Sequence, residues 1–197
     1  MSVFFSLKHC LLENPSPTPF NGTVARPPGD FFYICTALVL LPFGLVFDFL
    51  DGRVARWRNK SSLMGQELDS LADLISFGVA PAAVAFALGM RTDVDSVALA
   101  FFVLCGLARL ARFNVTVQSL PKDAAGKSKF FEGTPIPTTL GLDALMGFWL
   151  WKGWAGDGSV PGGVWLAGTP FELHASVLLF VVHGFLMTSR TIKIPKP

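Results

Sequence analysis

The stretch "FDFLDGRVARWRNKSSLMGQELDSLADLISFG" runs from Phe47 to Gly78, beginning at the end of one apolar run and ending inside another. It carries four aspartates, Asp48, Asp51, Asp69 and Asp73. Unpaired carboxylates at membrane depth are costly, at about 2.5 kcal/mol or more for an aspartate at a helix centre. Four of them where two apolar segments meet therefore indicate a functional polar site.

The composition of the chain is that of a membrane protein. Of its 197 residues, 51% are hydrophobic and only 15% are charged, whereas ordinary soluble domains carry about 25% charged residues. The net charge of +2 is small and no basic stripe alternates with aromatic residues. The sequence therefore predicts membrane lipids as surroundings and no nucleic-acid partner.

Five apolar segments are candidates for membrane spans, each of which needs about 20 mostly apolar residues. They are Phe31–Leu50, Leu71–Met90, Val97–Phe113, Pro137–Trp151 and Phe171–Met187. We therefore expect an all-α polytopic membrane protein, a helical bundle whose transmembrane domain covers residues 31–197. Residues 1–30 form a separate Pro-rich N-terminal segment, in which "SVFFSLKHCLL" is too short to span a membrane.

The distribution of lysine and arginine orients these spans, because loops rich in these residues face the cytosol. Basic residues gather in the 51–60 loop, in the 114–135 loop and after the last span, whereas only Arg91 and Lys152 fall in the opposite loops. The sequence thus predicts an integral membrane protein with its aspartates on the cytosolic side. Residues 152–170 are expected on the far side.

The spacing of the aspartates places them in two pairs. Asp48 and Asp51 are three residues apart and Asp69 and Asp73 are four apart, so each pair lies on one face of a helix. If the two helices run antiparallel, the pairs can face each other. Hard carboxylate oxygens suit magnesium, manganese or calcium rather than zinc. Two metal ions would fit two pairs, an arrangement common in displacement at phosphorus.

Small residues and a basic one are interleaved with the acids. Gly52, Ala55 and Gly65 allow a backbone or a ligand to approach closely, and Arg56 can contact a phosphate. The alternative is that the aspartates cap helix ends and pair with nearby arginines. For four acids in register, beside small residues, the functional interpretation is favoured.

These residues together resemble the motif of the CDP-alcohol phosphotransferase family, D-x2-D-G-x2-A-R, eight residues, G-x3-D-x3-D, and they match it at every position. The resemblance implies a helical bundle with a divalent-metal site that transfers a phosphatidyl or related group from a CDP-linked donor to a hydroxyl, releasing CMP. It also implies a first helix in the nucleotide pocket. Residues 1–30 do not match that helix, so we expect it to be missing or altered here.

Further segments resemble the serine-accepting branch of that family. They are "CGLARLARFNVT", "LPKDAAGKSKFFEGTPIPTT" and the terminal "KIPKP". This resemblance implies CDP-diacylglycerol as the donor and L-serine as the acceptor. It also implies a homodimer in the endoplasmic reticulum membrane, with Mg²⁺ or Mn²⁺ as cofactor, two ions per site.

The resemblance further implies a role for each matching residue. Asp73 would be the catalytic general base as well as a metal ligand. The other metal ligands would be Asp48, Asp51 and Asp69. The residues that bind the CDP-lipid would be Asp48, Gly52, Ala55, Arg56, Gly65 and Asp69.

Two arginines are candidates for binding serine, whose carboxylate must be held in a partly desolvated site. Arg109 and Arg112 end the third span at the level of the aspartates, and Phe113 follows as a possible wall. Arginine pairs with a carboxylate through a two-pronged contact. Alternatively, both arginines anchor the helix end at lipid headgroups. The resemblance favours substrate binding for Arg112.

Three other functions compete with this interpretation. A transferase of the same family with a different acceptor would keep the aspartates and change the acceptor pocket. An inactive, truncated family member would act as a partner subunit. An ion transporter would also need intramembrane acids, but clustering of the acids at one end of the spans disfavours it.

Overall fold

The computed structural model describes residues 29–57, 63–119, 130–154, 160–189 and 193–195. The chain is mostly helical, as the sequence predicts. The helical segments are α2 (Gly29–Trp57), α3 (Leu63–Leu74), the π-helical η1 (Ile75–Val79), α4 (Ala80–Leu88), α5 (Asp93–Ser119), the 3-10 turn η2 (Ile136–Thr139), α6 (Leu140–Trp151) and α7 (Val177–Thr188). Four short strands accompany them: β1 (Phe130–Glu132), β2 (Val164–Trp165), β3 (Leu173–His174) and β4 (Lys193–Pro195).

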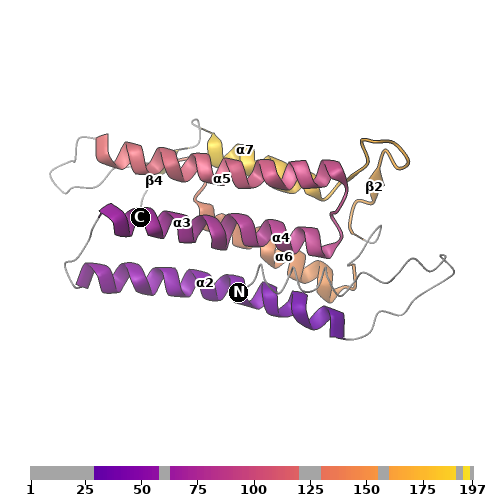
Figure 1. Cartoon of the computed structure of the whole chain (residues 1–197), viewed down its shortest axis with the longest axis horizontal. Helices are drawn as coiled ribbons and strands as arrows, with labels where there is room; N and C mark the ends of the chain where they lie inside the picture. Colours follow the sequence, from indigo (N-terminus) through magenta and orange to yellow (C-terminus); the bar gives the residue numbers. More distant parts are fainter. Residues whose placement is uncertain (1–28, 58–62, 120–129, 155–159, 190–192, 196–197) are drawn as a thin grey trace.

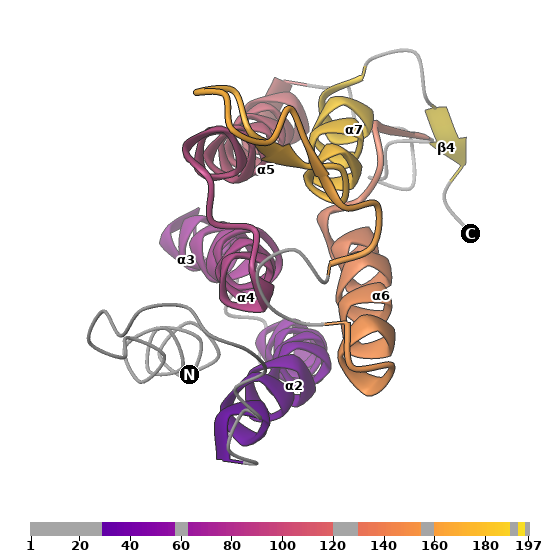
Figure 2. The ribbon, with the colours of Figure 1, turned by 90° about the vertical axis from the view of Figure 1, so that its right-hand side faces the viewer.

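The long helices lie side by side along one axis and alternate in direction (Figure 1). Viewed from the end of this bundle, α5 and α7 lie above α4 and α6, and α2 lies below (Figure 2). Segments α3, η1 and α4 make one nearly continuous helix, because Leu74, Val79 and Ala80 all keep right-handed helical backbone angles. This helix ends where Gly89 adopts a φ of 124°, a conformation that favours glycine.

The core consists of aliphatic and aromatic side chains from all of these helices. Phe102 of α5 meets Phe180 of α7 edge to face, with ring centroids 5.4 Å apart, and both are almost fully buried. Gly184 of α7 lets α5 approach, since a Cβ there would lie 3.3 Å from Cys105 Sγ. The tightest helix pair in the bundle is therefore α5 with α7, the pair that carries the C-terminal half of the fold.

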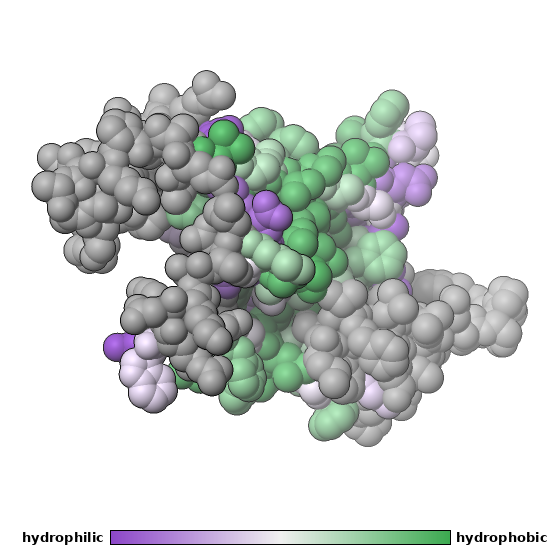
Figure 3. All heavy atoms as spheres, turned by 60° about the vertical axis from the view of Figure 1, so that its left-hand side comes forward, coloured by the Kyte–Doolittle hydropathy of each residue, from purple (hydrophilic) through white to green (hydrophobic). Residues whose placement is uncertain are grey.

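The outer surface of the bundle is apolar over wide areas. Side chains such as Val97, Leu104 and Val182 are more than half exposed, and hydrophobic residues dominate the described part of the face in Figure 3. Two helical segments, Glu67–Leu88 and Asp93–Val115, are long and apolar enough to cross a membrane, and Phe32–Phe47 and Val177–Thr188 are shorter apolar helices. The count of five spans stays a prediction.

The last predicted span, Phe171–Met187, is wrong at its start. Residues 173–174 form strand β3, which pairs antiparallel with β2 in the register Val164 to His174, and α7 begins only at Val177. The reason lies in α5, because Asp95 takes hydrogen bonds from the backbone and the ring of His174. A backbone N–H held by a carboxylate outside the helix does not take part in a regular helical ladder.

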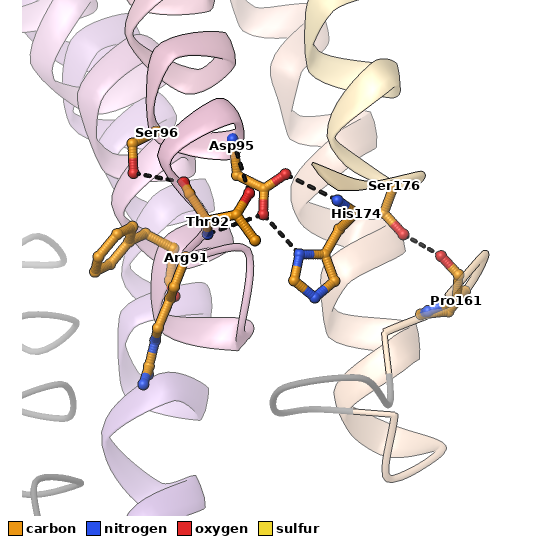
Figure 4. Close-up of polar contacts among 8 residues, drawn as sticks. Arg91, Thr92, Asp95, Ser96, Pro161, His174 and Ser176 are labelled. Atoms are coloured by element: carbon orange, nitrogen blue, oxygen red, sulfur yellow. Dashed lines mark hydrogen bonds and ion pairs between the residues drawn. The ribbon is translucent and has the colours of Figure 1, made fainter. Parts of the chain in front are cut away.

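The contacts at this end of the bundle form one network (Figure 4). Thr92 N–H donates to Asp95 Oδ2 and Asp95 N–H donates to Thr92 Oγ1, so the two residues cap the start of α5 reciprocally. Asp95 Oδ2 also lies 2.6 Å from His174 Nδ1. We call the start of α5 together with β2 and β3 the hairpin end.

Candidate active site

The opposite end of the bundle carries the predicted site residues. This acidic end consists of the C-terminal half of α2, helix α3 and the C-terminal half of α5, which gather on one side in Figure 1. Asp69 and Gly65 on α3 are exposed, and Asp73 is half-buried. Asp48, Asp51, Gly52, Ala55 and Arg56 belong to α2, but their side chains lie outside the described residues.

The backbone register of α2 against the following helix brings the two acid pairs to matching levels. The two helices come close at Gly44, where a Cβ would lie 3.6 Å from Ser76 Cβ. Antiparallel helices rise equally per residue, and Asp48 lies four residues after Gly44 while Asp73 lies three residues before Ser76, so these two acids lie within one residue of the same level. Steps of seven residues reach Asp51 and Asp69 in the same way.

Helix α5 contributes a polar seam along α3. Ser70 Oγ donates to Asn114 Oδ1 over 3.2 Å. One turn further into the bundle, the Asp73 carboxylate acts electrostatically on the half-buried Arg109 guanidinium. Arg109 Nε is buried and has no hydrogen-bond partner among the described residues. The structure therefore brings Arg109 together with Asp73, the predicted general base.

Arg112 lies on the side of α5 that faces α7. Its Nη1 donates to the carbonyl oxygen of Thr188 over 3.2 Å, at the C-terminus of α7. The last carbonyls of a helix lack intrahelical partners, so a guanidinium is a favourable cap there. Phe113 is 39% exposed. The two arginines that the sequence grouped together thus contact different helices.

Sequence reasoning did not single out Ser70 or Asn114, which join α3 to α5 beside the acids. The sequence did mark Asn114 as unusual, because it is a polar residue that follows Arg112 and Phe113 in an otherwise apolar helix. The role of Asn114 depends on α3 lying beside α5, and the spacing of residues along one helix does not reveal that neighbour.

The metal site is only partly covered by the described side chains. Within them, no three histidine, cysteine or acidic residues converge on a common point. Of the four proposed ligands, only Asp69 and Asp73 belong to that set, on one face of α3. Carboxylate oxygens are hard ligands that suit magnesium or manganese, so the donor chemistry of this end fits the predicted ions.

Comparison with known proteins decides the family. The family model described as CDP-alcohol phosphatidyltransferase matches residues 28–186. The chain belongs to the CDP-alcohol phosphatidyltransferase family. Members of this family generally depend on a divalent metal. Together with the apolar helices, membership indicates an integral membrane protein.

Named relatives within the CDP-alcohol phosphatidyltransferase family share one description. The CDP-diacylglycerol–serine O-phosphatidyltransferase of Saccharomyces cerevisiae is 58% identical over 197 residues, which is 100% of this chain and 67% of the yeast protein. The protein of the same description from Mycobacterium leprae is 42% identical over 114 residues, 55% of this chain and 38% of its own length. That of Bacillus subtilis is 38% identical over 106 residues, 53% of this chain and 55% of its own length. No solved structure matches.

Proposed function

We propose that the chain transfers the phosphatidyl group of CDP-diacylglycerol to the hydroxyl of L-serine, forming phosphatidylserine and CMP. The observation that carries this proposal is the match to the yeast enzyme over the whole chain, at 58% identity. It is supported by the complete acidic motif from Asp48 to Asp73, and the approach of Gly44 to Ser76 is consistent with the two acid pairs lying within one residue of the same levels.

The acidic end would hold the divalent metal through Asp48, Asp51, Asp69 and Asp73. Bound there, two Mg²⁺ or Mn²⁺ ions would neutralise the diphosphate and the charge that develops on the leaving CMP. Asp69, exposed in the middle of α3, is accessible from outside the bundle. Carboxylates at this boundary can therefore meet a water-soluble nucleotide while the acyl chains of the donor stay in the bilayer.

The donor pocket would consist of small and polar residues around these acids. Gly52, Ala55 and Gly65 would leave room for the nucleotide, and Arg56 would contact a phosphate. Asp48 and Asp69 would complete the pocket. Gly65 is exposed on α3, which is consistent with a surface that a ligand approaches.

The acceptor would react beside Asp73. The serine hydroxyl oxygen attacks the phosphorus that carries the diacylglycerol, and the bond from that phosphorus to the bridging oxygen breaks, so that CMP leaves with the electron pair. Asp73 accepts the hydroxyl proton. A metal-bound carboxylate is a weak base, so close placement and late proton transfer are needed.

The serine carboxylate would be held by the two arginines. Arg109 is the candidate that acts electrostatically on Asp73. Arg112 has one N–H bound to Thr188 O, and a guanidinium has further donors that can pair with a carboxylate. Phe113 would wall the pocket.

We further propose five spans within a domain at residues 31–197, with residues 1–30 as a separate segment and the active site facing the cytosol. The protein would be a homodimer in the endoplasmic reticulum membrane. Cysteine labelling in sealed vesicles tests the orientation. Labels should reach the 114–135 loop from the cytosolic face and the 152–170 loop only from the other. Access to 152–170 from the cytosolic face would overturn the orientation.

The function itself is tested by expressing the chain in cells that lack their own phosphatidylserine-forming activity. Membranes should release CMP from CDP-diacylglycerol only when serine and Mg²⁺ or Mn²⁺ are present. Inositol and glycerol 3-phosphate serve as alternative acceptors. Release with either of these in place of serine would assign a different acceptor. No release with any acceptor would favour a non-catalytic partner subunit.

A further inference from the structure

Residues of α6 and α7 line a groove. These two helices lie on the side of the bundle away from α3 (Figure 2). It arises because α7 packs chiefly on α5, whereas α6 packs on α2 and α4. The groove has a volume of about 340 Å³. Its walls include Thr134, Gly141, Leu142, Leu179, Val182 and Leu186.

The body of this groove is apolar and open to the outside. Leu179, Val182 and Leu186 are 40%, 55% and 40% exposed, on an apolar helix of the membrane protein. Two polar side chains of the wall, Thr138 and His183, bind each other. The Thr138 hydroxyl donates to Pro135 O at 2.6 Å, so its oxygen accepts from His183 Nε2 at 3.3 Å. Along its length the groove therefore offers hydrocarbon surface.

One end of the groove is different. Thr134 N–H donates to Leu186 O, which places Thr134 beside the last turn of α7. Thr134 Oγ1 is buried and, within the described part of the chain, has no hydrogen-bond partner. A buried hydroxyl without a partner loses free energy that a ligand acceptor would restore.

We propose that this groove binds one acyl chain of a bilayer glycerophospholipid. The chain lies along Leu179, Val182 and Leu186, and its ester carbonyl accepts a hydrogen bond from the Thr134 hydroxyl. The order along the groove, from hydrocarbon wall to lone hydroxyl, matches the order of chain and ester in such a lipid. This lipid is separate from the CDP-linked donor, because the groove lies across the bundle from the acids of α3.

Two glycines of α6 provide a matched pair of variants. A Cβ at either Gly141 or Gly147 would meet no atom within 4 Å, but only Gly141 lines the groove. Gly141→Leu should fill the groove without disturbing the packing, and Gly147→Leu should leave it open. Both changes remove a helix glycine, so they share the same gain in helix propensity.

The experiment uses the full chain in phosphatidylcholine vesicles that contain a trace of phosphatidylcholine with a photoactivatable group on one acyl chain. Mapped cross-links should concentrate on α6 and α7 over Val97 and Leu104 of α5, which are more exposed. Gly141→Leu should reduce the α7 cross-links about tenfold, as expected when the contact area is removed, and Gly147→Leu should not. Thr134→Val should reduce them about fivefold, the value of one lost hydrogen bond.

Several results would overturn this inference. Equal labelling around the bundle, or labelling that Gly141→Leu leaves unchanged, would mean ordinary bilayer contact. Loss of labelling with added CDP-diacylglycerol would make the groove part of the donor site. Cross-links between α7 segments of two chains would mean that a second copy fills it. Serine-dependent CMP release is measured in the same vesicles, so failure of the proposed chemistry would be seen separately.

Discussion

An aspartate has opposite surroundings at the two ends of the bundle. At the hairpin end, Asp95 is 0% exposed and accepts hydrogen bonds from Thr92 N–H and from the His174 backbone and ring. At the acidic end, Asp69 is exposed in the middle of α3. A buried carboxylate with all its contacts supplied by the protein holds the fold together, whereas an exposed one in a motif of acids is open to a ligand.

This contrast predicts that acids at the acidic end are needed for activity and not for stability. Asp69→Ala should lower serine incorporation by at least about a hundredfold, because it removes a metal ligand, and should leave the protein folded in the membrane. Glu67→Ala is the matched control, since Glu67 is an exposed acid on the same helix outside the motif. Near-normal incorporation by Asp69→Ala would refute the two-pair metal site.

The reverse is expected at the hairpin end. Asp95→Ala should lower the free energy of unfolding by about 3 kcal/mol, because His174 and the start of α5 lose a buried charged partner. Thermal unfolding in detergent, followed by circular dichroism, measures the loss. Activity per folded molecule should be nearly unchanged. Asp93→Ala changes an exposed acid in the same helical turn and is the control. An equal loss there would mean that the loss of stability does not come from the Asp95 contacts.

The arginines of α5 sharpen the comparison within one helix. Arg109→Lys and Arg112→Lys keep the charge and lose the planar fork. Each should raise the Michaelis constant for serine by roughly ten- to a hundredfold, equivalent to about 1.5–3 kcal/mol for a charge-assisted contact, and leave that for CDP-diacylglycerol unchanged. Kinetics with each substrate varied at saturation of the other decide this.

Arg112→Lys has a second, structural readout. It should also lower the unfolding temperature, because a lysine, which lacks the rigid planar guanidinium, caps Thr188 O less well, and Arg109→Lys should not. If Arg112→Lys changes only the unfolding temperature, Arg112 is a helix cap and the serine site belongs to Arg109. If Arg112→Lys raises the Michaelis constant for CDP-diacylglycerol instead of that for serine, Arg112 belongs to the donor site.

The smallest effect is expected at Asp143, which belongs to neither end. This residue of α6 is 5% exposed, and within the described residues neither of its carboxylate oxygens has a hydrogen-bond partner. Asp143→Leu should raise the free energy of unfolding by about 1 kcal/mol, because it removes an uncompensated buried polar group of similar size. Activity should stay normal. A loss of stability in that variant would point to a ligand on Asp143.

Local pattern was a good guide to the helices and a poor one to the last span. The helices expected at Val97–Phe113 and Pro137–Trp151 are confirmed, within α5 and within η2 with α6. The segment from Phe171 reads as the start of a span because its side chains are mostly apolar. Its first residues instead pair with β2 and bind Asp95, which lies 79 residues away from His174. No window of local sequence contains that partner.

The sequence by itself determined the family, the helical class and the acid motif, because these depend on residue types at short spacings along a helix. The tertiary structure decided which neighbours those residues meet. Arg109 and Arg112 are three residues apart, a turn of about 60° around α5, yet one acts electrostatically on Asp73 of α3 and the other binds Thr188 O of α7. Because α5 lies between those two helices, a small angle on its surface selects a different partner, and only the packing of the whole bundle sets that choice.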